Sequence, residues 1–166
     1  MRAVAREAGI SKGLLYHYFT SKRELFDATL EAAAAELRAR TAPPGAGEPL
    51  EQLTASVDAY LGWIEENSDA YVRLLRSANA LSAVSSLIER IRADTAERIL
   101  EAVSDGPPSP GLRIAVDGWL WFMDGACLNW LAHRDMARER LRDLLVAAMA
   151  GALGAAAQAD PGARLR

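Results

Sequence analysis

The chain of 166 residues contains one cysteine and two histidines. Cys127 cannot form a disulfide within the chain, and these residues are too few for a structural zinc site, so we expect no metal and no cofactor. No run of about 18 uncharged apolar residues is present, and no basic segment followed by an apolar one opens the chain. We therefore expect a cytoplasmic protein with no membrane span.

The alternating apolar pattern of β-strands is also missing, because apolar residues recur at intervals of three and four. This periodicity predicts an all-α chain of about eight helices. Breaks rich in proline and glycine lie at 43–47 and 106–111. We expect a first domain at 1–40 and a second at 41–166. The expected helices include 2–8, 11–18, 21–40, 68–81, 110–133 and 136–157.

Several polar side chains are expected to mark helix ends. Ser21 and Glu24 form a capping-box pattern. Ser68 and Asp135 each precede a predicted helical stretch and are expected to act as N-caps. The tail from Asp160 is expected to fray.

Charge is distributed unevenly. Residues 1–26 carry five basic side chains and two acidic ones, although the whole chain has a net charge of −3. Both lysines of the chain, Lys12 and Lys22, lie in this segment. A basic head on an acidic body is typical of a protein that presents one face to nucleic-acid phosphates.

The segment 5–22 predicts a helix, a tight turn and a second helix. Ala5 is small where the two helices cross, and Gly9 can adopt the left-handed backbone that the turn requires. Ser11 can cap the second helix, and Leu15 can close a small core. This arrangement allows a short helix to enter the major groove of DNA.

Residues 2–26 resemble the TetR family of bacterial transcriptional regulators. The shared pattern is an alanine, the turn glycine, Lys-Gly-x-Leu-Tyr-x-Tyr-Phe and a Ser-Lys pair. The resemblance implies a DNA-binding head and a helical body that binds a small-molecule effector and dimerises. The residues that it places at double-stranded DNA are Ser11, Lys12, Gly13, Leu14, Tyr16, His17, Tyr18 and Lys22.

Members of this family carry a further helix before the segment that starts here at Met1. We therefore expect Val4, Leu15, Phe19 and Leu25 to lack a cover. One hypothesis is that the true start lies upstream, and another is a truncated product. If the chain begins at Met1, weak DNA binding is expected. The alternative function is then a DNA-binding-deficient protein that dimerises and binds a ligand.

The last two predicted helices, 110–133 and 136–157, are expected to form a homodimer interface. Small residues recur at intervals of seven at Gly111, Gly118, Gly125 and Ala132. The final helix carries an apolar stripe of Leu141, Leu144, Leu145, Ala148, Met149, Ala152 and Leu153. Packing of the same faces within one chain is the alternative.

Aromatic residues and a few polar ones in the body are candidates for a ligand pocket. They are Tyr60, Trp63, Tyr71, Trp119, Trp121, Phe122, Met123, Asp124, Cys127 and Trp130. The carboxylate of Asp124 beside tryptophans could hold a cationic or amine-bearing ligand. The alternative is that these aromatics form an ordinary core, with Cys127 as a packing residue rather than a redox sensor.

The sequence therefore predicts a ligand-responsive transcriptional regulator, and we expect it to be a repressor. It is expected to bind a palindromic operator as a homodimer and to be released by a small-molecule effector. An enzyme is not expected, because no Ser/His/Asp or Cys/His set and no phosphate-binding loop is present.

Overall fold

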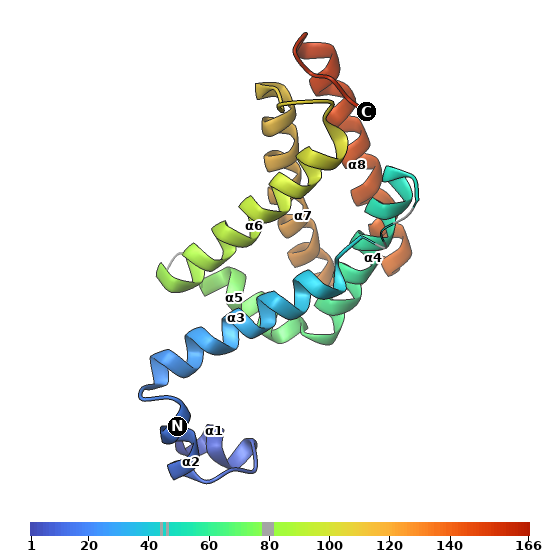
Figure 1. Ribbon diagram of the computed structural model, residues 1–166. Coiled ribbons are helices and arrows are strands. Elements are labelled where there is room, and N and C mark those ends of the chain that lie inside the picture. The colour runs from blue at the N-terminus through green and yellow to red at the C-terminus, as the bar shows by residue number, and fades with distance from the viewer. Residues whose placement is uncertain (44, 46, 78–81) are drawn as a thin grey trace. The chain divides into compact units, whose positions relative to one another are not determined.

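The computed structural model describes residues 1–43, 45, 47–77 and 82–166. Within these residues the chain forms eight helices and only one isolated β-bridge, between Ser104 and Leu165 (Figure 1). The all-α prediction is confirmed. The helices are α1 Arg2–Glu7, α2 Lys12–Tyr18, α3 Lys22–Arg40, α4 Pro49–Glu66, α5 Ser68–Ser77, α6 Ser82–Val103, α7 Pro110–His133 and α8 Arg138–Ala159.

The chain divides into two compact units, Met1–Glu36 and Leu37–Arg166, and the boundary falls inside α3. The last turn of α3 therefore belongs to the second unit. Within that unit Arg38 forms an ion pair with Asp94 of α6 at 3.4 Å. These contacts anchor the end of α3 to the body.

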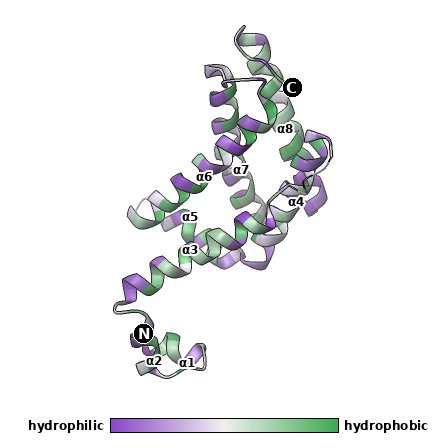
Figure 2. Ribbon diagram, viewed as in Figure 1, coloured by the Kyte–Doolittle hydropathy of each residue, from purple (hydrophilic) through white to green (hydrophobic). Residues whose placement is uncertain are grey.

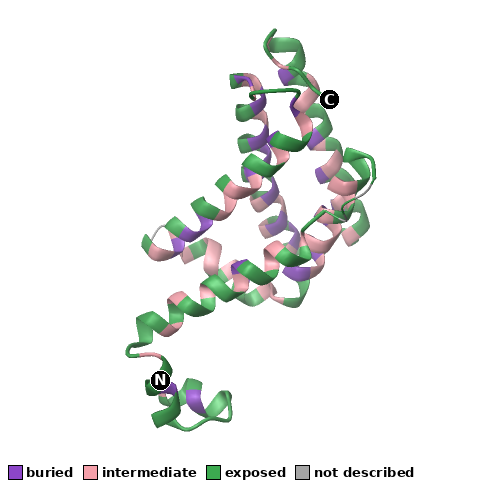
Figure 3. Cartoon of the chain, viewed as in Figure 1, coloured by how far each residue is buried: buried purple, intermediate pink, exposed green. Residues whose placement is uncertain are grey.

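The core of the second unit lies around α7, which packs against α6 and α8, while α8 also packs against α4. Hydrophobic residues are concentrated along these helices, and their inward faces are buried (Figures 2 and 3). Two tryptophans of α7 also form hydrogen bonds within this core. The indole N–H of Trp119 donates to the carbonyl of Leu145 at 2.8 Å, and that of Trp130 donates to Met136 at 2.7 Å.

By length and composition, α8 is apolar enough to cross a membrane, and it is the one such helix among the described residues. Its residues Leu141, Leu145 and Met149 are buried, and α8 contacts both α4 and α7. These contacts are those of a core helix in a helical body. Leu144 and Ala147 of α8 are exposed, whereas Val146, Ala148, Ala152 and Leu153 are half-buried.

The C-terminal tail differs from the prediction that it frays. The Asp160 carboxylate accepts hydrogen bonds from the backbone N–H groups of Gly111 at 2.7 Å and Gly162 at 2.9 Å. Two backbone hydrogen bonds also join the tail to residues 103–105. The prediction was wrong because the first N–H groups of α7 have no partner inside the helix, and a carboxylate from the tail supplies one.

Two predicted N-caps are also corrected. Ser68 is the first residue of α5, and Asn67 before it donates its side-chain amide to the carbonyl of Trp63 at 3.0 Å. The N-cap of α8 is Ala137, with no side-chain hydrogen bond, so Asp135 does not cap it. The expected extension of α5 to residue 81 lies outside the described residues.

Candidate functional site

The turn between α1 and α2 forms as its residues predict. Gly9 has a φ of 65°, and the next N–H group, of Ile10, donates to the carbonyl of Ala5 at 3.0 Å. The hydroxyl of Ser11 accepts the N–H of Leu14 at 3.0 Å and so caps α2. Ala5 is buried at the crossing, as expected.

The start of α3 is fixed by a variant of the predicted capping box. Ser21 accepts the N–H of Glu24 at 3.0 Å. The Glu24 carboxylate, however, accepts the backbone N–H of Thr20 at 2.7 Å and its hydroxyl at 2.6 Å. These hydrogen bonds, first of all that from the Thr20 hydroxyl, lower the pKa of Glu24. They hold the turn that positions Lys22.

All eight residues assigned to DNA are exposed in the first unit: seven lie on α2 or at its N-cap, and Lys22 is the first residue of α3. The ammonium of Lys12 lies 5.4 Å from the ring centroid of Tyr16. The rings of His17 and Tyr18 pack edge to face at 5.3 Å, and Tyr18 is 67% exposed. The outer face of α2 therefore combines a cation with aromatic groups that are free to contact another molecule.

Gly13 is placed where the fold itself does not require a glycine. A Cβ atom added there would meet only the hydroxyl oxygen of Ser11, at 3.9 Å. Glycine inside a helix costs roughly 0.5–1 kcal/mol relative to alanine. The absence of a side chain therefore favours close approach by something outside the chain.

The expectation that the head lacks a cover holds in part. Val4 is 42% exposed, whereas Phe19 and Leu25 are half-buried. Leu15 is 4% exposed, so its predicted exposure was wrong. Packing between α1 and α2 is enough to bury it.

In the second unit, three helices bring polar side chains to one carboxylate on a fourth helix. Asp124 of α7 accepts the hydroxyl of Tyr60 from α4 at 3.4 Å and that of Tyr71 from α5 at 3.2 Å. The two hydroxyls are 3.0 Å apart. Arg92 of α6 donates its Nε–H to Asp124 at 3.0 Å, and its Nη2 atom completes the ion pair. We call these four residues the Asp124 cluster.

Sequence reasoning did not identify Arg92, although a signal was available. Arg92 occupies the inward row of α6 between Ile88 and Ala96, which are both buried. A charged residue in such a row requires a partner of opposite charge. The guanidinium also lies over the ring of Trp121, with Cζ 3.7 Å from the ring centroid.

Burial determines the protonation of the cluster. Desolvation, followed by the negative charge of Asp124, raises the pKa of the Cys127 thiol to about 12. Desolvation also raises the pKa values of Tyr60 and Tyr71 well above their ordinary range. The two phenols therefore stay protonated and act as donors to Asp124.

The other predicted pocket residues are scattered. Trp119 and Trp130 serve the core through their indole hydrogen bonds. Trp63 and Met123 are buried, and the indole N–H of Trp63 has no hydrogen-bond partner among the described residues. Trp121 and Phe122 are 64% and 46% exposed, so neither lines an interior pocket. The large apolar groups point outward because they occupy the outer face of α7.

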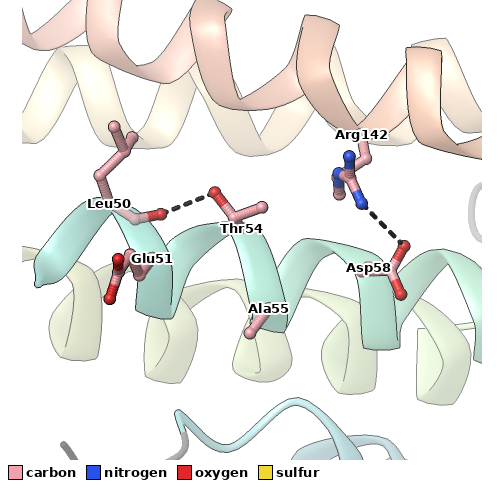
Figure 4. A pocket seen from close by; sticks show the side chains of 6 residues that line it. All are labelled: Leu50, Glu51, Thr54, Ala55, Asp58 and Arg142. Atoms are coloured by element: carbon pink, nitrogen blue, oxygen red, sulfur yellow. Dashed lines mark hydrogen bonds and ion pairs between the residues drawn. The ribbon is translucent and has the colours of Figure 1, made fainter. Parts of the chain in front are cut away.

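Hollows on the surface of this unit include a cleft and a groove. A cleft of about 220 Å³ between α6 and α7 is lined by Glu89, Arg92, Ala93, Asp117, Leu120 and Trp121. A groove of about 440 Å³ lies between α4 and α8, where Asp58 pairs with Arg142 at 3.7 Å (Figure 4). Of these two, the cleft adjoins the Asp124 cluster, because Arg92 belongs to both.

The predicted dimer stripes are only partly free. Leu141, Leu145 and Met149 are buried within the chain, and a Cβ at Gly111 would lie 2.7 Å from Cβ of Asp160. These residues are corrected to intrachain packing. Small and apolar residues that remain exposed along α7 and α8 include Ile114, Gly118, Trp121, Phe122, Gly125, Ala132, Leu144, Ala147 and Gly151. We call them the outer α7–α8 face.

The sequence matches known families in both units. Residues 1–29 match the bacterial regulatory proteins of the tetR family, and residues 49–152 match the family described as tetracyclin repressor-like, C-terminal domain. The HTH-type transcriptional regulator BetI of Rhizobium meliloti (strain 1021) is 32% identical over 125 residues. That similarity covers 63% of this chain and 62% of the relative, so the chain spans less than two thirds of the relative's length.

Solved structures show the same fold. A tetR-family transcriptional regulator from Streptomyces coelicolor is 28% identical, with a TM-score of 0.86 over 95% of this chain and 72% of that one. A putative TetR-family regulator from Rhodococcus sp. shares 24% identity, with a TM-score of 0.72 over 90% and 85% of the two chains, and indicates the fold alone. The family consists of transcription regulators rather than enzymes, as the sequence predicts. The chain belongs to the TetR family of transcriptional regulators.

Proposed function

We propose that this protein is a ligand-responsive repressor that acts in the cytoplasm, binds a palindromic operator as a homodimer, and releases it when a small molecule occupies the body. The observation that carries the proposal is the exposed face of α2. Lys12, Gly13, Leu14 and Tyr16 are exposed there, and the fold does not require a glycine at position 13. Such a face has the donors, close backbone and apolar contact that base-edge recognition uses.

Individual roles follow from the chemistry of the exposed groups. The Lys12 ammonium can donate to guanine O6 and N7, and Leu14 can contact a thymine methyl group. Tyr16, His17, Tyr18, Ser11 and Lys22 offer donors to phosphate oxygens, which position the head without reading sequence. Base contacts and phosphate contacts are therefore expected to respond differently to mutation.

The Asp124 cluster supports an effector site in the body. Asp124 of α7 is linked to three other helices, and α6 contributes both Arg92 to this cluster and Asp94 to the ion pair with Arg38. A ligand that alters the position of α6 would therefore also shift the last turn of α3, through the ion pair between Asp94 and Arg38. Coupling of about 1–3 kcal/mol is sufficient for effector release of DNA.

The outer α7–α8 face supports a homodimer. It presents Ile114 at 73% exposure and Leu144 at 46% next to exposed glycines. Small residues allow helices of two chains to approach closely, and an isologous interface of four helices uses the same face twice. A dimer places two heads on one DNA, which matches a palindromic operator.

Fluorescence anisotropy on DNA from the chain's own upstream intergenic region tests the proposal against a scrambled duplex. We expect selective binding in the range of about 10⁻⁸ M. Lys12→Ala is expected to weaken it by about 1–3 kcal/mol and to relax selectivity. Arg23→Ala is the matched control, because Arg23 is exposed but pairs with Asp27 on α3.

Two other outcomes are informative. Equal, salt-sensitive binding to both duplexes would reject the repressor and favour the alternative of a DNA-binding-deficient protein that dimerises and binds a ligand. Selective binding that is unchanged in Lys12→Ala would show that α2 does not read the operator.

A further inference from the structure

The Arg92 guanidinium lies among groups that proteins use to bind cationic ligands. Its Cζ atom is 3.7 Å from the ring centroid of Trp121, and its Nε–H donates to Asp124 at 3.0 Å. The hydroxyls of Tyr60 and Tyr71 donate to the same carboxylate and hold it in place. An aromatic face next to an oriented carboxylate favours an organic cation over a neutral molecule.

Negative charge predominates around this guanidinium. Glu89 and Asp117 line the 220 Å³ cleft together with Arg92 and Trp121. Glu89 accepts a hydrogen bond from Ser85, and neither Glu89 nor Asp117 forms an ion pair with any residue that the structure describes. Two further carboxylates therefore share a cleft with Arg92, in addition to Asp124, which pairs with it. A cleft of this charge attracts a further cation and repels an anion.

We propose that Asp124, Trp121, Tyr60 and Tyr71 form a binding site for a small organic cation, and that the Arg92 guanidinium occupies this site when no ligand is bound. The inference rests on the proposed function in taking this cluster as the effector site, and it adds the chemical class of the effector. It also assigns Arg92 as an intramolecular competitor of the ligand.

The cleft provides a second position for the displaced arginine. Glu89 precedes Arg92 by three residues on the same face of α6, and Asp117 lines the cleft from α7. When a ligand cation binds Asp124, the guanidinium can pair with either of these carboxylates. The exchange leaves no buried charge without a partner, which would otherwise be strongly destabilising.

The ligand takes the position of a guanidinium group, so a cation of about that size is required. The adjoining cleft of about 220 Å³, which Arg92 and Trp121 line but Asp124, Tyr60 and Tyr71 do not, lies below the range of about 300–1,000 Å³ that is typical of sites for drug-sized molecules. A quaternary ammonium or alkylguanidinium ion with few carbon atoms meets this requirement. Tetramethylammonium is therefore a suitable probe.

Binding of tetramethylammonium chloride to the 166-residue chain is measured by isothermal titration calorimetry. tert-Butanol is the neutral control of similar shape, and sodium chloride controls for ionic strength. The Nε–H resonance of Arg92, identified by its loss in Arg92→Lys, reports whether the guanidinium leaves Asp124. We expect saturable binding of the cation, a shift of this resonance toward that of an exposed arginine, and no binding of tert-butanol.

Variants of Arg92 distinguish an arginine that competes with the ligand from one that only stabilises the fold. Arg92→Gln is expected to bind tetramethylammonium at least tenfold more tightly, since a site that is open in roughly a tenth of molecules or fewer becomes fully open. Arg92→Gln/Asp124→Asn leaves no buried charge unpaired, so it serves if the single variant does not fold, and it is expected not to bind. Arg98→Gln on the exposed face of α6 is the control and is expected to match the wild type.

The proposal is overturned if the wild type does not bind the cation, if binding leaves the Arg92 resonance unchanged, or if the double variant binds as well as the wild type. Operator anisotropy with and without the cation tests the proposed function separately. Displacement of Arg92 without any effect on DNA affinity would retain the cation site and reject its role as effector site. Release of DNA by a different molecule, with no cation binding, would retain the repressor and reject this inference.

Discussion

Substitution of the two central glycines of the outer α7–α8 face distinguishes a dimer interface from a free surface. In the double variant Gly118→Leu/Gly125→Leu, the new side chains enter open space within the chain, because a Cβ at either position has no neighbour within 4 Å. Leucine is a better helix former than glycine by about 0.8 kcal/mol. The two changes should therefore stabilise the isolated chain by about 1–2 kcal/mol.

The same side chains have the opposite effect on a dimer that packs through this face. A twofold interface repeats each substitution, so four leucines are inserted where helices approach closely. At about 1 kcal/mol each, the lower end of the cost of overpacking, dimerisation weakens by about 4 kcal/mol. That corresponds to roughly a thousandfold higher dissociation constant.

Sedimentation velocity across a range of concentrations gives the dissociation constant, and urea unfolding gives the stability. Glu97→Leu adds an equivalent apolar group to the exposed face of α6 and serves as the control. An unchanged dimer in the glycine variant would refute the assignment of this face. Lower stability of the dissociated chain would instead show that the face packs within the chain.

Three other predictions concern the head, the thiol and the tail. Leu15→Ala removes one of the few buried side chains of the first unit, and should cost about 2–4 kcal/mol there; operator anisotropy should show lost binding while the melting temperature of the body stays unchanged. Cys127, with a pKa of about 12, should not react with Ellman's reagent at pH 8 until urea unfolds the chain; rapid labelling of the folded protein would contradict this. Hydrogen bonds from Gly111, then Ser109 and Gly162, lower the pKa of Asp160 below its ordinary 3.8, so its stabilisation is present above that pH and is lost as pH falls. Asp160→Asn should therefore lower the melting temperature at pH 7, and the difference from the wild type should shrink below about pH 4, whereas a difference independent of pH would count against the carboxylate.

The sequence alone predicted the features that depend on residues close together along the chain. The turn at Gly9, the Ser11 cap and the exposed row of α2 depend on residues within four positions of one another. Helical periodicity likewise identified α7 and α8 as apolar helices. Backbone conformation and i to i+3 or i+4 contacts are encoded locally, so spacing in the sequence predicts them.

Tertiary structure alone determined which of several equivalent residues meet. The sequence singled out Asp124, Tyr60 and Tyr71, but only helix crossings paired Asp124 with Arg92, 32 residues earlier. Packing also divided the apolar stripe of α8 between the core and the outer face, and brought Asp160 back to the start of α7. Such contacts depend on the angles at which helices cross and on backbone N–H groups that have no partner within their own helix. The spacing of residues along one helix encodes neither of these.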